Sequence, residues 1–251
     1  MGGRSRESRG PLNIAHRGAN QVAPENTLRA FQEALNRGAD GIELDVRLSA
    51  DGVPVVIHDA TVEATTDGSG AVANMTFAQL RTLDAGGWLD PAFKGERIPS
   101  LEEVLDTFGG RTVLNLELKG AQVLDNDLVP TVVDLLERHE LQQEVLVSCF
   151  NPYLLRQVRR LAPRVPLALL YTNSPLPLRR LADLLLGEQP AAIHPHHTNV
   201  SERLVAHAHE LGVRVNVWTI DDPQRMRVLA DGGVDGIITN KPALLRRVLK
   251  R

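Results

Sequence analysis

Two carboxylates alternate with apolar residues in the run from Gly41 to Leu48. Glu43 and Asp45 are two positions apart, and side chains at that spacing on a strand point to the same face. Two acids on an apolar strand are costly to bury unless they bind a cation or a charged partner. A third acid, Glu117, lies in a second alternating run. Carboxylates from two strands form the oxygen-rich set that Mg²⁺ or Ca²⁺ selects, so we predict one divalent cation at Glu43, Asp45 and Glu117.

Basic and histidine side chains end the neighbouring apolar runs. His16 and Arg17 close the first run of the chain, His58 closes the third, and Lys119 follows the third acid. A cation with two further positive side chains neutralises a phosphoryl group, and two histidines provide one group that removes a proton and one that donates it. This combination favours phosphodiester cleavage, with His16 and His58 as the candidate proton carriers and Arg17 and Lys119 as the further positive charges.

The placement of His58 depends on a predicted hairpin. Only four residues separate Leu48 from Val53, whereas a parallel neighbour needs a crossover of about a dozen or more. A simple four-residue turn pairs Leu48 with Val53, and therefore Glu43 with His58, which puts His58 on the face of Glu43 and Asp45. A shift of one residue would move it to the other face.

The remaining pattern predicts an α/β fold, a TIM-like (β/α)8 barrel with a hairpin and a small insert after the second strand. Short apolar runs alternate with amphipathic stretches of helical length, and removing the hairpin strand leaves the eight strands that such a barrel requires. The glycine- and proline-rich interval of about 60–99 is the expected insert. We expect residues 1–11 to be a disordered tail and 12–251 to form one barrel domain. The predicted strands are Leu12–Gly18, Gly41–Leu48, Val53–His58, Thr112–Lys119, Glu144–Phe150, Pro166–Tyr171, Ala191–Pro195, Arg214–Ile220 and Gly236–Thr239.

Composition narrows the class of protein. The chain has 251 residues, 43% hydrophobic and 24% charged, with a net charge of -3, which is ordinary for a globular enzyme and unlike a nucleic-acid-binding protein. The single cysteine, Cys149, excludes an intrachain disulfide and favours a reducing, cytoplasmic location. No apolar run has the length of a membrane span or a signal peptide. The oligomeric state is left open.

Five motifs in order resemble the signature of the glycerophosphodiester phosphodiesterase family, and the resemblance extends over nearly all of the chain after Pro11. They are His16-Arg17-Gly18, Pro24-Glu25-Asn26-Thr27, Glu43-x-Asp45, His58-Asp59 and Glu117-x-Lys119. The chain departs from the family at Ala64, where a basic residue is frequent, and at Asp221, where asparagine is common.

The resemblance implies a metal-dependent hydrolase that converts glycerophosphodiesters, such as glycerophosphocholine or glycerophosphoethanolamine, to sn-glycerol 3-phosphate and an alcohol. It implies that the adjacent glycerol hydroxyl attacks phosphorus and that water opens the resulting cyclic phosphate. His16 and His58 would be the general acid and base in an order left open, and the three acids would hold the cation. Arg17 and Lys119 would bind the phosphate, and Trp218 would contact the substrate.

Alternatives remain for several of these residues. Glu43 and Asp45 could form ion pairs with Arg17 and Lys119 without a metal, and Trp218 could simply fill the end of the barrel. Asn26 could cap the following helix. The histidines at 194, 196 and 197 are interpreted as a loop near the barrel mouth rather than as a second metal site.

Two other functions are open. A lysophospholipase D would use the same site on a diester that still carries an acyl chain, and it predicts an apolar groove over the mouth. A non-catalytic barrel that binds phosphorylated ligands would have lost a histidine or a metal-binding acid, yet this chain has all five candidates.

Overall fold

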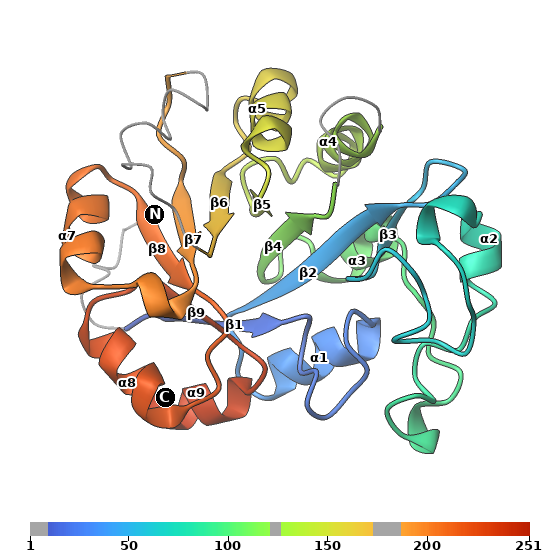
Figure 1. Ribbon diagram of the computed structural model, residues 1–251, viewed down its shortest axis with the longest axis horizontal. Helices are drawn as coiled ribbons and strands as arrows, with labels where there is room; N and C mark the ends of the chain where they lie inside the picture. Colours follow the sequence, from blue (N-terminus) through green and yellow to red (C-terminus); the bar gives the residue numbers. More distant parts are fainter. Residues whose placement is uncertain (1–9, 121–126, 173–186) are drawn as a thin grey trace.

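The computed structural model describes residues 10–120, 127–172 and 187–251. Eight parallel strands form a closed barrel, because β1 pairs with both β2 and β9 and the other strands follow around the ring. Helices surround the strands in Figure 1. The predicted TIM barrel is therefore confirmed, whereas most of the predicted tail, residues 1–9, lies outside the described residues. The strands are β1 Leu12–His16, β2 Gly41–Leu48, β3 Pro54–Val56, β4 Val113–Leu118, β5 Val145–Cys149, β6 Leu167–Tyr171, β7 Ala192–Pro195, β8 Arg214–Val217 and β9 Gly236–Thr239.

The helices cover the outer face of the barrel, and side chains cap the first turns of α1, α2, α3, α5, α7 and α8. Thr27 accepts from the backbone of Ala30 at the start of α1, and Ser100 and Glu103 form a capping box on α3, so backbone donors that a helix leaves unpaired are satisfied. The α-helices are α1 Leu28–Asn36, α2 Phe77–Leu80, α3 Leu101–Phe108, α4 Leu128–Arg138, α5 Pro152–Leu161, α7 Glu202–Glu210, α8 Pro223–Asp231 and α9 Pro242–Val248.

Alternation along β2 and β4 separates the core from the barrel interior. Leu44 and Leu116 are fully buried in the main apolar cluster, which also contains Phe31 of α1 and Phe108 of α3. The residues between the apolar positions, among them Glu43, face the opposite way. Burial of apolar side chains between strands and helices thus leaves the polar residues of the same strands inside the barrel.

The hairpin forms with a register one residue away from the predicted one. Leu48 pairs with Pro54, and the backbone N–H of Ser49 donates to the carbonyl of Val53 over 3.0 Å. Gly52 has φ +79°, and a residue in the left-handed region allows a three-residue turn here. The predicted pairing of Glu43 with His58 is therefore wrong.

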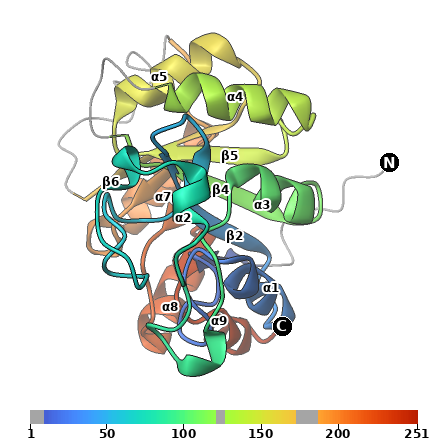
Figure 2. The same cartoon turned by 90° about the vertical axis from the view of Figure 1, so that its right-hand side faces the viewer.

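The insert between β3 and α3 has an apolar cluster of its own. Val55 of β3 pairs with Ser100 in an isolated antiparallel bridge, so the end of the insert lies next to the strand from which the insert starts. Figure 1 shows α2 beside the ends of β2 and β3, on the opposite side of the molecule from α7, and Figure 2 shows α2 toward the viewer when that side is turned to the front. None of the helices in the described ranges has the length and apolar character needed to cross a membrane. The cluster consists of Val55, Ile57, Val62, Val72, Leu80, Ala85 and Ile98.

Candidate active site

A cavity of about 270 Å³ lies at the carboxyl ends of the barrel strands. Seven of the eight predicted site residues line it, and the eighth, Asp45, lies beneath Lys119, whose Nζ is 3.1 Å away. Active sites of (β/α)8 enzymes occur at this end of the barrel. The lining residues are His16, Arg17, Glu43, His58, Asn115, Glu117, Lys119, Phe150, Leu170, Trp218, Thr219 and Ile238.

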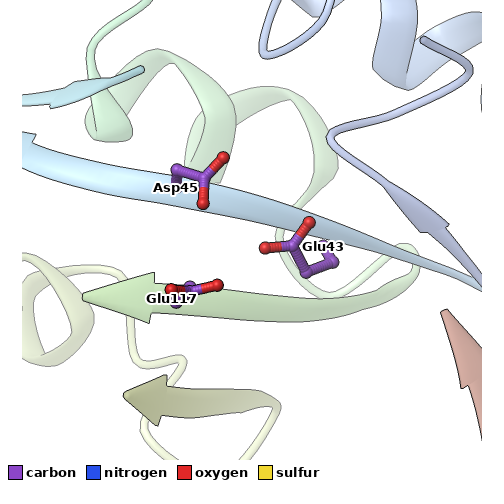
Figure 3. A group of neighbouring side chains, drawn as sticks. All are labelled: Glu43, Asp45 and Glu117. Carbon is purple, nitrogen blue, oxygen red and sulfur yellow. The ribbon is translucent and has the colours of Figure 1, made fainter. Parts of the chain in front are cut away.

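The three predicted metal ligands lie together on two neighbouring strands. Asp45 of β2 pairs in register with Glu117 of β4, and Glu43 precedes Asp45 on the same face. One oxygen from each carboxylate lies within 4.8 Å of the others, and all three residues are buried. Figure 3 shows the carboxylates turned toward one another. No other group of three or more acid, histidine or cysteine side chains at this spacing occurs in the described parts of the chain.

Two cations compensate these acids unequally. Lys119 Nζ lies 3.1 Å from Asp45 and also pairs with Glu117, and Arg17 Nε lies 3.2 Å from Asp45. Burial opposes ionisation of Asp45, but Lys119 and Arg17 outweigh it and hold the pKa of that carboxyl below its usual value. Asp45 is thus a stable anion.

Glu43 is in the opposite situation. Its Oε2 accepts from the backbone N–H of Arg17 over 3.0 Å, but its Oε1 is buried and accepts no hydrogen bond from the described residues. Burial first, and then the charges of Asp45 and Glu117, raise the pKa of Glu43 well above its usual value. Burial and Asp45 likewise raise the pKa of Glu117. The site therefore carries more buried negative charge than its cations balance, and an oxygen-binding divalent cation fits it.

The loop after β1 supports Asp45 through two residues in an uncommon backbone conformation. Arg17 and Asn26 have φ values of 55° and 57°, and such angles cost non-glycine residues of order 1–3 kcal/mol. The Asn26 amide donates to Asp45 over 2.8 Å, and its backbone N–H donates to the Arg17 carbonyl over 3.0 Å. Because Thr27 caps α1, Asn26 is not the cap and instead holds a site carboxylate.

Both histidines line the cavity, and they have different partners. His16 Nδ1 lies 2.7 Å from the amide oxygen of Asn240, and its Nε2 lies 4.0 Å from Glu43. Burial, followed by the charge of Arg17, lowers the pKa of His16 to about 4. His58 Nδ1 lies 2.6 Å from a carboxylate oxygen of Asp59. His58 follows the end of β3, where strand alternation no longer applies, and so lines the cavity although its predicted register was wrong.

Aromatic rings form one wall of the cavity. Trp218 packs edge-to-face on Phe150 with ring centroids 5.5 Å apart, and on His196 at 5.2 Å. Its indole N–H donates to the carbonyl of His194 over 2.8 Å. The buried His194 ring accepts from Asn216, so this histidine is tied into the barrel interior.

Sequence reasoning missed several residues that support the site. Arg47 donates to the backbone carbonyls of His58 and Lys119 over 2.8 and 3.2 Å and thereby joins two loops of the mouth. Asn240, the partner of His16, follows β9, and its position at a strand end was an available signal. Asp221 was noted only as a departure from the family pattern.

Comparisons with known proteins agree with this site. The glycerophosphoryl diester phosphodiesterase family matches residues 16–244. The glycerophosphodiester phosphodiesterase of Caldanaerobacter subterraneus subsp. tengcongensis is 39% identical over 241 residues, which cover 96% of this chain and 98% of that protein. The Bacillus subtilis glycerophosphodiester phosphodiesterase is 30% identical over 255 residues, covering 95% and 86%.

Solved structures give the same result. A phosphodiesterase from Oleispira antarctica, in complex with the product sn-glycerol-3-phosphate, superposes with a TM-score of 0.88 at 31% identity and covers 99% of this chain and 100% of its own. The glycerophosphodiester phosphodiesterase from Agrobacterium tumefaciens has a TM-score of 0.81 at 32% identity and covers 93% and 98%. The predicted resemblance is confirmed, and this chain belongs to the glycerophosphoryl diester phosphodiesterase family and is an enzyme that hydrolyses glycerophosphodiesters.

Proposed function

We propose that the enzyme is metal-dependent and converts water-soluble glycerophosphodiesters, such as glycerophosphocholine or glycerophosphoethanolamine, to sn-glycerol 3-phosphate and an alcohol. The observation that carries the proposal is the buried group Glu43, Asp45 and Glu117, whose negative charge exceeds that of its cations, beside a cavity lined by two histidines. The product bound to the Oleispira antarctica phosphodiesterase supports the substrate class.

Glu43, Asp45 and Glu117 would hold one divalent cation, Mg²⁺ or Ca²⁺. When bound, it supplies positive charge to the phosphate oxygens and so favours attack at phosphorus. The buried Glu43 oxygen that accepts no hydrogen bond from the described residues fits this role, since buried charges are normally paired or coordinate metals.

Arg17 and Lys119 would bind the phosphate, because both line the cavity and are held in place by Asp45. Binding the phosphate between fixed cations orients the ester for attack and stabilises the charge that develops on its oxygens. Trp218 presents its ring to the same cavity and would pack on the glycerol.

The partners of the two histidines suggest how they divide the proton transfers. The Asp59 carboxylate orients the His58 ring through Nδ1 and leaves Nε2 free to serve a proton transfer. His16 lies against a neutral amide and is disfavoured as a cation by burial and by Arg17. We therefore assign His16 as the base that accepts the proton of the attacking hydroxyl and His58 as the acid that protonates the leaving alcohol.

A coupled assay for released glycerol 3-phosphate tests this function. Glycerophosphocholine and glycerophosphoethanolamine are each supplied with EDTA, and then with Mg²⁺ or Ca²⁺ restored. Release that disappears with EDTA and returns with one of the ions is expected. A parallel reaction with lysophosphatidylcholine separates the lysophospholipase D alternative, and it is followed by released choline because its other product would be lysophosphatidic acid. Choline release from that lipid, with no release of glycerol 3-phosphate from the two water-soluble diesters, would contradict the proposed substrate class. Turnover that persists in EDTA would contradict the metal requirement.

A further inference from the structure

A chain of hydrogen bonds connects His16 to a carboxylate outside the cavity. His16 ends β1, Asn240 follows β9 and Asp221 lies four residues beyond the end of β8, and these three strands are neighbours in the barrel. His16 Nδ1 is 2.7 Å from Asn240 Oδ1, and Asn240 Nδ2 is 2.6 Å from Asp221 Oδ2. Neither Asn240 nor Asp221 lines the cavity, so they can reach the chemistry only through the histidine.

The carboxylate determines which way the Asn240 amide points. An ionised carboxylate accepts hydrogen bonds and donates none. Asp221 Oδ1 accepts from the Asn240 backbone N–H and from the Thr239 hydroxyl, each over 2.9 Å, and Oδ2 can then face only the NH₂ group of Asn240. The oxygen of that amide is therefore turned to His16 and to Asn20, whose amide donates to it over 2.6 Å.

We propose that Asp221, acting through Asn240, fixes the tautomer of His16 that carries its proton on Nδ1 and leaves the Nε2 lone pair facing the cavity. An amide oxygen can only accept, so neutral His16 must donate from Nδ1. Asp221 and Asn240 are positioning residues. The inference rests on the proposed role of His16 as the general base.

The proton balance of the reaction requires this tautomer. As the attacking oxygen forms its bond to phosphorus, its proton passes to Nε2 of His16, which becomes the imidazolium while Nδ1 stays bonded to Asn240. The bond from phosphorus to the leaving alcohol oxygen breaks, and that oxygen takes a proton from His58. A His16 ring protonated on Nε2 instead would have its lone pair on Nδ1, turned away from the cavity, and could not accept the first proton.

The variant Asp221→Asn reverses the amide chain. Its new oxygen still accepts from Thr239 and from the Asn240 backbone, so its new NH₂ faces the Asn240 side chain. Two NH₂ groups repel, and Asn240 turns its oxygen toward position 221 and its NH₂ toward His16. Nδ1 must then accept, and the ring proton moves to Nε2.

The double variant with Asp221→Asn and Asn240→Asp restores the original direction. The amide at position 221 donates to the new carboxylate at position 240, and the other oxygen of that carboxylate accepts from His16 Nδ1. The matched control is Asp222→Asn, which removes a carboxylate at the next position. Asp222 caps α8 by accepting from Arg225 over 2.7 Å, a role that asparagine also fills.

Turnover of glycerophosphocholine with saturating metal gives the first test. Asp221→Asn should lower kcat by about 10²- to 10⁴-fold, the contribution of a general base, with KM changed by no more than a few fold. The double variant should recover at least tenfold over the single variant, and Asp222→Asn should match the wild type. Wild-type kcat in Asp221→Asn, or no recovery in the double variant, would overturn the inference.

Long-range ¹H–¹⁵N correlation spectra of histidine-labelled protein at pH 8 give a test that does not depend on activity. The His16 signals, assigned by their loss in His16→Gln, should report a protonated Nδ1 in the wild type and the double variant and a protonated Nε2 in Asp221→Asn. A wild-type His16 protonated on Nε2 would refute the inference even if no variant folds. Absence of turnover in the wild type with the expected tautomer would instead count against the proposed function alone.

Discussion

Glu43 and Asp45 belong to the same acidic group, yet their neutral variants should change the stability of the metal-free enzyme in opposite directions. Asp45→Asn removes the partner of Lys119 and Arg17, and breaking a buried ion pair costs about 3–5 kcal/mol. Lys119 retains its ion pair with Glu117, and Arg17 retains its ion pair with Glu25. We therefore expect a loss of free energy of unfolding at the lower end of this range, about 3 kcal/mol. For a chain of this size, that lowers Tm by roughly 6–12 °C.

Glu43→Gln should leave the metal-free enzyme at least as stable as the wild type. The variant retains an acceptor for the Arg17 backbone N–H and removes a charge that burial and two neighbouring acids disfavour. A carboxyl whose pKa is raised on folding binds a proton that the unfolded chain releases, so stability falls as pH rises above the ordinary glutamate value through the raised one. The variant lacks this loss, and its advantage should grow from pH 5 to pH 9.

Thermal melts in EDTA at pH 5, 7 and 9 measure both effects, and the same melts with Mg²⁺ or Ca²⁺ provide the comparison. A ligand at a hundred times its Kd stabilises by about 2.7 kcal/mol, so the wild type should gain roughly 5–11 °C. Both variants should lose most of that gain because each lacks a proposed ligand. The charge argument is refuted if Glu43→Gln melts well below the wild type in EDTA at pH 9. It is also refuted if Asp45→Asn melts at the same temperature as the wild type.

Three further predictions concern other parts of the site. His16→Ala and His58→Ala should each lower kcat by about 10²- to 10⁴-fold in the coupled assay while retaining the metal-dependent rise in Tm; unimpaired turnover would remove the residue from the mechanism. Asn26→Ala should lower the free energy of unfolding by about 1.5–3 kcal/mol in denaturant melts, since a hydrogen bond to buried Asp45 is lost, and Asn26→Gly separates that loss from backbone strain. Burial, followed by the charge of Arg214, lowers the pKa of His194 to about 3. Below pH 6.5 the unfolded chain therefore binds more protons than the folded chain, and the free energy of unfolding decreases as the pH is lowered. Denaturant melts at pH 8 and pH 4.5 should show His194→Gln losing roughly 3 kcal/mol less than the wild type; equal losses would contradict the burial argument.

The sequence predicted the features that follow from the regular alternation of apolar and polar side chains along a strand. Alternation in β2 and β4 placed Glu43, Asp45 and Glu117 on one face, and the number of apolar runs predicted the barrel. The hairpin register was missed because it depends on the conformation of Gly52 and on one hydrogen bond of Ser49, and neither has a signature in the apolar period.

Contacts between separate loops were also beyond the pattern. Asn26 bonds Asp45 across 19 positions, and Asn240 bonds His16 across 224. The residue types at these positions were visible, but the direction of an amide is decided by its partners in space. Sequence reasoning could therefore name the histidines and acids and could not say which nitrogen of His16 carries the proton.

The structure departs from the most stable local choices where the chemistry would occur. Arg17 and Asn26 adopt left-handed backbone angles, and Glu43 is buried without full compensation of its charge. Both features concern the same pair of acids, because Asn26 and Arg17 contact Asp45 and the Arg17 N–H binds Glu43. Local rules of folding are expected to fail at functional sites, and here a bound cation would relieve the larger of the two costs. Stability and metal affinity should therefore be coupled in this enzyme, so that variants which stabilise the metal-free protein by neutralising Glu43 do so by giving up the proposed cofactor.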